Sequence, residues 1–285
     1  MTAFRHTLRV SAAELGRALP WIGHADPWAI LVSEVMLQQT SVSRVVVPWR
    51  RFVDSFPTPT SCADAPLADV LRLWAGLGYH RRAKALHDAA RVMRDRFDGA
   101  VPRDVGDLMS LPGVGEYTAH AVASFAFSKR VAVLDTNVGR VLARAIANRP
   151  LQRSEARAMA RELLPSNGVA AFNQAMIDLG AKYCRKSPRC SECPVRGHCS
   201  WHLAGGDDPA PHSAGVSRPQ SRFAGSDRQL RGSMLAELRR CSRTPSRLFA
   251  SLNGTDESRL ESILEGLVRD GLVQRRGRTI RLTGS

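Results

Sequence analysis

The chain has 285 residues, enough for one large domain or for two ordinary domains and an appendage. Its 44% hydrophobic and 24% charged residues are typical of proteins that bury a core, and this balance excludes an intrinsically disordered chain. The 41 lysines and arginines outnumber the 26 acidic residues, so the formal net charge is +15. A GC-rich genome would explain why arginine supplies most of these cations, but not why cations exceed acids. The charge therefore favours a polyanionic partner, most simply nucleic acid.

Hydropathy and cysteine content exclude other classes of protein. No segment approaches the roughly 20 apolar residues that a transmembrane helix needs. The chain begins Met-Thr-Ala-Phe-Arg-His, without the charged-then-apolar pattern of a secretion signal, so we expect a cytoplasmic protein. In that reducing compartment the six cysteines are expected to be free thiols or metal ligands rather than disulfides.

Residues 8–200 are predicted to be almost entirely helical. Ser11 and Glu14 have the spacing of a capping box, which would open a helix that reaches about Leu19. Pro27 suits the first turn of the next helix, in which apolar residues recur at helical spacing as far as Leu37. No sustained alternation of apolar and polar residues occurs before residue 270, which argues against a sheet-based core. Further helices are predicted at residues 42–56, 66–75, 81–96, 104–109, 117–127, 136–147, 154–164 and 169–183.

The composition changes at about residue 204. Residues 205–226 are rich in Gly, Ser, Pro, Asp and Ala and are predicted to form a linker. Beyond it, helices are predicted at residues 227–240, 245–252 and 257–270, followed by a short hairpin at 271–282. Three helices and a hairpin predict a winged-helix-like module at residues 227–285.

The segment from Leu111 to Ala119 is the first chemical motif. Its glycines, Gly113 and Gly115, permit a tight turn with positive φ and a close approach of the backbone to a ligand. The helix expected from Tyr117 would point its free N–H groups at the same place, which is a phosphate-binding arrangement. A simple turn is the alternative for a bare Gly-x-Gly, but the flanking Leu-Pro and Thr-Ala favour a helix–hairpin–helix that holds a DNA strand.

Four of the six cysteines fall within sixteen residues. Their spacing is Cys184-x5-Cys190-x2-Cys193-x5-Cys199, in a segment rich in basic residues. Such a set fits either an iron–sulfur cluster or a structural zinc ion, and the spacing alone does not choose between them.

Two acidic residues occupy unusual places. Glu34 lies among Ile30, Leu31 and Leu37 on an apolar helical face, so we expect partial burial and a raised pKa, which suits a general acid. Asp135 follows an apolar run and precedes a helix. A solvated helix face is the alternative for Glu34, and a helix cap is the alternative for Asp135.

In chain order these motifs resemble the helix–hairpin–helix DNA glycosylase superfamily. Within it they are most similar to the MutY-type adenine DNA glycosylases, in a short form without a Nudix-like C-terminal domain. The resemblance implies an all-α, two-module helical fold with an iron–sulfur cluster loop, to which the small winged-helix-like module is added. It covers about residues 15–204 and is carried by residues 19–21, 33–40, 76–79, 111–119, 134–140 and 172–181. The implied domains are residues 1–25 with 131–204 (cluster-bearing module), 26–130 (six-helix module with the helix–hairpin–helix), 205–226 (linker) and 227–285 (winged-helix-like module).

The resemblance also implies a reaction. The enzyme would extrude adenine from the duplex, Glu34 would protonate adenine N7, and ionised Asp135 would stabilise the cationic sugar. Tyr117 stands where bifunctional endonuclease III-type relatives have a lysine that attacks the sugar, which implies a monofunctional glycosylase. Gln39 and Tyr79 would wedge into the base stack. The implied base and DNA contacts are Gln38, Gln39, Thr40, Tyr79, Leu111, Gly113, Gly115, Asn137 and Gln174, and the implied ligands of a 4Fe-4S cluster are Cys184, Cys190, Cys193 and Cys199.

The implied partner is double-stranded DNA with A:8-oxoG or A:G mispairs in base excision repair, bound by a nucleoid-associated monomer with no membrane contact. Two features depart from the family. Ile22 stands where relatives commonly have Arg or Gln, and the first cluster interval has five residues instead of six. The alternatives are a thymine or uracil mismatch glycosylase of the same fold and a non-catalytic DNA-binding protein.

Overall fold

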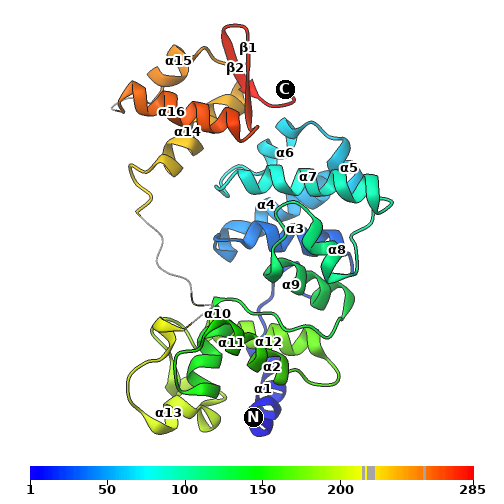
Figure 1. Ribbon diagram of the computed structural model, residues 1–285, viewed down its shortest axis with the longest axis vertical. Coiled ribbons are helices and arrows are strands. Elements are labelled where there is room, and N and C mark those ends of the chain that lie inside the picture. Colours follow the sequence, from blue (N-terminus) through cyan, green and yellow to red (C-terminus); the bar gives the residue numbers. More distant parts are fainter. Residues whose placement is uncertain (214–215, 217–221, 253–254) are drawn as a thin grey trace. The chain divides into compact units, whose positions relative to one another are not determined.

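The structure is a computed structural model that describes residues 1–213, 216, 222–252 and 255–285 (Figure 1). It is predominantly helical, which confirms the predicted all-α class, and the strands of its described residues form one short hairpin near the C-terminus. The predicted linker at 205–226 lies partly outside the described residues. No helix of the described part is long and apolar enough to cross a membrane.

The chain forms two compact units. The first contains residues 1–25 and 115–219, and the second contains residues 26–114 and 220–285. This division differs from the predicted domains in two respects. Residues 115–130 group with the first unit, and the C-terminal module groups with the second.

Helix α3 (Pro27–Leu37) is buried in the second unit. It begins where Asp26 accepts hydrogen bonds from the backbone N–H groups of Trp28 and Ala29, with Pro27 in the first turn. Because its sequence is apolar on nearly every face, the helix is buried from Trp28 to Met36. The other helices between residues 26 and 114 are α4 (Val42–Ser55), α5 (Pro59–Asp64), α6 (Leu67–Leu73), α7 (Arg81–Arg96) and α8 (Val105–Ser110).

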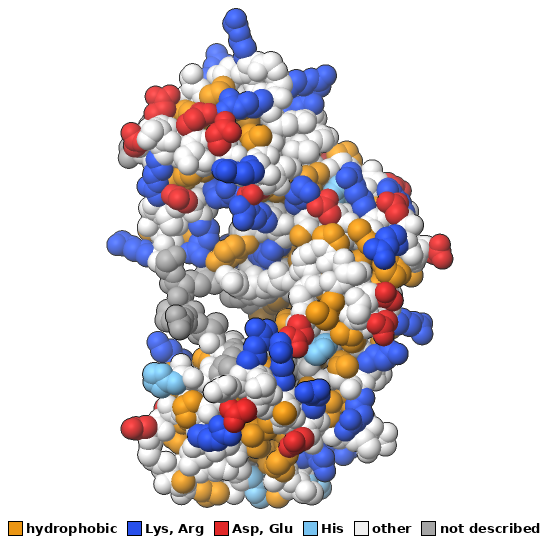
Figure 2. Space-filling model, viewed as in Figure 1, with side chains coloured by type: hydrophobic (Ala, Val, Ile, Leu, Met, Phe, Trp, Pro, Cys, Tyr) orange, Lys and Arg blue, Asp and Glu red, His pale blue; other side chains and the backbone are white. Residues whose placement is uncertain are grey.

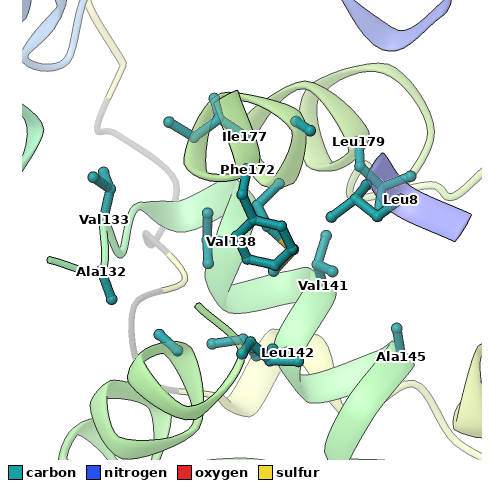
Figure 3. Close-up of a cluster of buried hydrophobic side chains, with 14 of the residues drawn as sticks. Leu8, Ala132, Val133, Val138, Val141, Leu142, Ala145, Phe172, Ile177 and Leu179 are labelled. Carbon is teal, nitrogen blue, oxygen red and sulfur yellow. The ribbon is translucent and has the colours of Figure 1, made fainter. Parts of the chain in front are cut away.

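The first unit has its own hydrophobic core (Figure 3). Phe172, Leu179, Val138 and Leu142 meet in this core, and Leu8 brings the N-terminal segment into it. Its helices are α1 (Thr2–Val10), α2 (Ala12–Leu15), α9 (Glu116–Phe127), α10 (Thr136–Val141) with a π-helical turn (Leu142–Ala147), α11 (Arg153–Glu162), α12 (Val169–Lys182) and α13 (Ser200–Ala204). Shorter 3-10 turns cover Cys190–Glu192, Arg196–His198 and Ala210–His212.

The predicted helix from Ser11 to about Leu19 is wrong. Ser11 continues the αR backbone of α1 and makes no side-chain cap, and α2 ends at Leu15. The helix ends there because Gly16, a poor helix former, leaves helical backbone with a ψ of 135°, and Arg17 then forms a 2.6 Å ion pair with buried Asp178 of α12.

The C-terminal module matches the predicted elements. Its helices are α14 (Asp227–Arg240), α15 (Pro245–Ala250) and α16 (Glu257–Arg269). Strands β1 (Val273–Arg276) and β2 (Thr279–Leu282) pair antiparallel, with Val273 opposite Leu282, which confirms the predicted hairpin. Arg243 adds a bridge to Ile280 of β2.

Candidate active site and DNA-binding surface

The turn after α8 needs glycine for two separate reasons. Gly113 has a φ of +76°, and a Cβ built on it would lie 2.7 Å from the Cβ of Ala85. Val114 closes the turn by donating to the Leu111 carbonyl at 3.1 Å. Gly115 then caps α9 in extended backbone. The free N–H groups of the first turn of a helix in this position bind anions.

Cationic residues surround the start of α9. Tyr117 lines a cavity of about 740 Å³ together with Arg130 and the α11 residues Arg153, Arg157 and Arg161. Glu116, in the first turn of α9, pairs with Arg157 and, at 3.6 Å, with Arg153. One carboxylate therefore orients two of the four guanidinium groups, and the net charge of the wall is positive. Lys and Arg side chains are also spread over the visible surface of both units, with acidic side chains among them (Figure 2).

Two loops of the second unit carry residues with left-handed backbone. Gln39, after α3, has a φ of +56°, and Tyr79, before α7, has a φ of +47°. Non-glycine residues rarely adopt this conformation, and it persists only where surrounding contacts hold it. Gln38 adds a 3.3 Å hydrogen bond from its Nε2 to the Gly113 carbonyl, so the loop after α3 also contacts the glycine turn.

The contacts that hold both loops converge on Arg82 of α7. Its guanidinium stacks on two aromatic rings, with Cζ at 5.4 Å from the centre of the Tyr79 ring and at 5.5 Å from the centre of the Trp74 ring. Burial lowers the pKa of Arg82 to about 10, which leaves it charged at neutral pH. Sequence reasoning missed this residue. Its guanidinium donates, over 2.6 to 3.2 Å, to the carbonyls of Val35, Met36, Gln38, Leu77 and Gly78 and to Thr40 Oγ1.

Glu34 is buried on α3, with 6% of its surface exposed, as the apolar face around it predicts. The alternative of a solvated face is thereby excluded. Its neighbour Ser33, fully buried, donates back to the Ile30 carbonyl at 2.7 Å and so needs no partner outside the helix. A carboxyl in such surroundings is held by a rigid helix rather than by a loop, which suits a group that must be aimed at a substrate.

Asp135 caps α10, so the structural role that the sequence suggested is present. Its Oδ1 accepts from the Val138 N–H at 2.7 Å, and its Oδ2 accepts from Asn137 Nδ2 at 2.6 Å. Arg140 in turn donates to Asn137 Oδ1 at 2.7 Å. Burial of the carboxylate raises the pKa of Asp135, while these hydrogen bonds and the charge of Arg140 oppose the shift.

Asn137 and Gln174 are both fixed by α12. A Cβ on Gly180 would lie 2.6 Å from Asn137, so the glycine permits α10 to pack closely against α12. Gln174 donates from Nε2 to Asp178 Oδ1 at 3.0 Å, and the same carboxylate oxygen accepts from Arg17. Next to it, buried Asn173 donates to the Val131 carbonyl and to Ser124, both at 2.9 Å. Asn173 thus anchors the strand-like segment that leads to Asp135, a role that the sequence did not reveal.

The predicted residues are divided between the two units. The second unit holds Glu34, Gln38, Gln39, Thr40, Tyr79, Leu111 and Gly113, and the first holds Gly115, Tyr117, Asp135, Asn137, Gln174 and the four clustered cysteines. Within the second unit, Gln38, Gln39 and Tyr79 line one cavity. Within the first unit, Asp135 and Asn137 are hydrogen-bonded to one another.

The four clustered cysteines share one small cavity. Cys184, Cys190, Cys193 and Cys199 line a space of about 30 Å³ whose other walls include apolar side chains of α10 and α12. In the described residues, no three His, Cys, Asp or Glu side chains already have a metal-binding arrangement. The donor set nevertheless fits a metal centre, because four thiols from one polar segment converge on an apolar pocket.

Arg144 places a buried positive charge at this pocket. It is almost fully buried, at 1% exposure, and its Nη1 lies 3.4 Å from Cys184 Sγ. Asp208 fixes the guanidinium through two hydrogen bonds of 2.8 and 2.6 Å. A buried cation beside thiolate ligands offsets the negative charge that such a set carries. No sequence pattern singles out this residue, because arginine is common throughout the chain.

Comparison with known proteins identifies the superfamily to which this fold and these motifs belong. Residues 32–166 match the HhH-GPD superfamily of base excision DNA repair proteins. A thermostable thymine-DNA glycosylase has a similar structure, with a TM-score of 0.66 and 27% identity, covering 71% of this chain and 96% of that one. An endonuclease III trapped in a covalent complex with DNA is also similar, with a TM-score of 0.62 and 26% identity, covering 71% and 97%.

Sequence comparison identifies the family within this superfamily. The chain is 43% identical to the adenine DNA glycosylase of Mycolicibacterium smegmatis over 265 residues, which cover 90% of this chain and 88% of the relative. The chain therefore belongs to the adenine DNA glycosylase family of the HhH-GPD superfamily.

Proposed function

We propose that this protein is a monofunctional glycosylase that removes adenine from mispairs with 8-oxoguanine or guanine in double-stranded DNA, as a step of base excision repair. The observation that carries the proposal is the 43% identity to an adenine DNA glycosylase, which extends over nearly all of both chains. The fold by itself does not choose the base, since a thymine-DNA glycosylase shares it. A thymine or uracil mismatch activity is therefore the alternative that the experiment must separate.

Glu34 is the proposed general acid. A buried carboxyl on a rigid apolar helix suits proton donation to adenine N7, because burial favours the neutral form of the acid. Protonation makes the base a better leaving group. Cleavage of the N-glycosidic bond then releases adenine with the bonding electron pair and leaves an oxocarbenium-like sugar, as in glycoside hydrolysis. Water adds to C1′ of this sugar with loss of a proton and gives the abasic site.

Asp135 is the proposed carboxylate that stabilises this sugar cation. Burial raises its pKa, but the N–H of Val138, the amide of Asn137 and the charge of Arg140 favour its ionised form. The cation that forms in the reaction favours the ionised form further. Tyr117 has no amine to form a Schiff base with the sugar, so no lyase step is proposed.

The proposed DNA contacts follow from the surfaces described above. The glycine turn at Gly113 and Gly115 holds a phosphate, and Asn137 lies near the sugar and its phosphates. Gln39 and Tyr79 enter the base stack from two loops, and Arg82 donates hydrogen bonds to backbone carbonyls of both loops. Gln38 and Thr40 support the first loop, Leu111 the turn, and Gln174 contacts the adenine edge.

Four further points belong to the proposal. The cysteines at 184, 190, 193 and 199 hold a 4Fe-4S cluster, which supplies structural support for a DNA-binding loop. The protein acts as a monomer. It works at the nucleoid in the cytoplasm. As a functional division of the chain, residues 1–25 join residues 131–204, a division that differs from the two compact units described above.

A panel of duplexes tests the proposal. Wild-type protein is incubated with duplexes that carry A:8-oxoG, A:G, T:G and U:G pairs and a matched A:T control. The expected product is an abasic site in the A:8-oxoG and A:G strands, which breaks only after alkali. Excision of thymine or uracil instead would establish the alternative, and binding without any abasic product would establish a non-catalytic protein. Strand breakage without alkali would refute the monofunctional assignment.

A further inference from the structure

The C-terminal module contacts the loop that carries Tyr79. Arg228 of α14 donates to the Tyr79 hydroxyl at 2.6 Å, and its guanidinium lies 5.5 Å from the centre of the same ring. The same guanidinium lies 5.3 Å from the centre of the Phe223 ring, whose residue is 56% exposed. The orientation of the Tyr79 ring is therefore shared between Arg82 of α7 and Arg228 of the C-terminal module.

Further polar contacts fix the module to α7. Asp270, at the end of α16, accepts from Arg81 at 2.6 Å and from Arg231 of α14. Arg239 of α14 lies 3.3 Å from the Nε2 of His80. These contacts place α14 beside the segment from Tyr79 to Arg82 and make the interface strongly cationic.

The module and this segment together form a cavity of about 500 Å³. Among the described residues its lining contains no carboxylate. Burial lowers the pKa of His80 to about 4, and the charges of Arg239, Arg231 and Arg82 add to this shift. Asp270 offsets part of the charge of Arg81 and Arg231, but the four guanidinium groups of the lining keep a net positive charge that attracts an anion. The lining residues are Gln38, Gln39, Tyr79, His80, Arg81, Arg82, Arg228 and Arg231.

We propose that the C-terminal module is a DNA-binding element of the lesion site, in which Arg228 binds a backbone phosphate beside the place where Tyr79 enters the base stack and also positions the Tyr79 ring. The inference rests on the proposed function, because that function assigns Gln39 and Tyr79 to the stack. The ligand is a DNA phosphate because four guanidinium groups line a cavity that is also lined by Gln39 and Tyr79, the two residues proposed to enter the base stack. The C-terminal module thus contributes to mispair recognition.

The experiment uses the full chain and a duplex with a tetrahydrofuran abasic analogue opposite 8-oxoguanine. Dissociation constants are measured over a series of KCl concentrations. Arg228→Gln retains a donor for Tyr79 but loses the charge. We expect it to weaken binding by about tenfold and to reduce the slope of log Kd against log[KCl] by about one. Arg228→Lys should restore the slope but not the full affinity, because an ammonium does not stack as a guanidinium does.

Arg247→Ala is the matched control, since Arg247 is an exposed arginine of α15 in the same module. It should bind with the wild-type affinity and slope. A wild-type slope in Arg228→Gln would overturn the inference, and so would an equal loss of slope in Arg247→Ala. The adenine-excision panel on wild-type protein tests the proposed function separately. If the panel shows another excised base while Arg228→Gln still lowers the slope, only the base assignment fails.

Discussion

Arg82→Ala is the substitution that most directly tests how the two predicted wedge loops are held. Six hydrogen bonds of 2.6 to 3.2 Å run from this guanidinium, five of them to backbone carbonyls of the last turn of α3 and of the loops that carry Gln39 and Tyr79. A hydrogen bond to a charged group contributes roughly 1.5–3 kcal/mol net, but bonds of one group are not additive, and water reaches some of the released carbonyls. We therefore expect the free energy of unfolding to fall by about 3 kcal/mol.

Urea unfolding followed by circular dichroism provides the assay. With an m value of about 3 kcal/mol/M for a protein of this size, the midpoint should fall by about 1 M. Excision of adenine should lose at least about tenfold in kcat/KM, because Gln39 and Tyr79 are no longer held in left-handed backbone. Arg91→Ala, an exposed position on the same helix, is the control and should change the free energy of unfolding by less than about 0.5 kcal/mol. An Arg82→Ala protein as stable and as active as this control would refute the reasoning.

Four other substitutions test separate parts of the structure. Gly113→Ala should reduce stability by about 2 kcal/mol and weaken duplex binding, because the new Cβ meets Ala85 at 2.7 Å and φ is positive; a wild-type melting temperature and Kd would contradict this. Asp135→Asn keeps a good helix cap, so stability should change by less than about 1 kcal/mol while single-turnover excision falls at least about 100-fold; parallel losses in both would assign Asp135 a structural role alone. The pKa of His80 is about 4 in the folded state and 6.5 in the unfolded state, so the unfolded state binds more protons between these pH values. The free energy of unfolding should therefore fall by up to about 3 kcal/mol as the pH drops from 6.5 to 4. His80→Gln should remove this part of the pH dependence in urea titrations, and an unchanged profile would show that His80 is not its source. Purified wild-type protein should be yellow-brown with about four irons per chain, and Cys193→Ser should lower the iron content and broad visible absorption; colourless protein that contains zinc would exclude the cluster.

Local sequence patterns predicted much of the fold. Apolar spacing located α3, α7 and α12, and the glycine pair at 113 and 115 located the turn between α8 and α9. Burial of Glu34 followed from its apolar neighbours alone. These features depend on interactions between residues close in sequence, which a pattern can represent.

The errors and omissions have long-range causes. The capping-box pattern at Ser11 was overridden because Ser11 continues the helical backbone of α1, and the helix stops before Gly16, after which Arg17 reaches Asp178, 161 residues away. The roles of Arg82 and Arg144 depend on carbonyls and side chains from other elements, so neither stands out among 37 arginines. Contacts between α14 and the Tyr79 loop likewise join positions about 150 residues apart, and no local pattern indicates them.

The most direct test of the account is single-turnover excision of adenine from an A:8-oxoG duplex by wild type and by Glu34→Gln. This substitution keeps the size of the side chain and removes its acidic proton. We expect an alkali-sensitive abasic site with wild type, and a loss of at least about 100-fold in rate with Glu34→Gln while the Kd for an abasic-analogue duplex changes less than about threefold. Full excision activity in Glu34→Gln, or no adenine release by wild type, would contradict it.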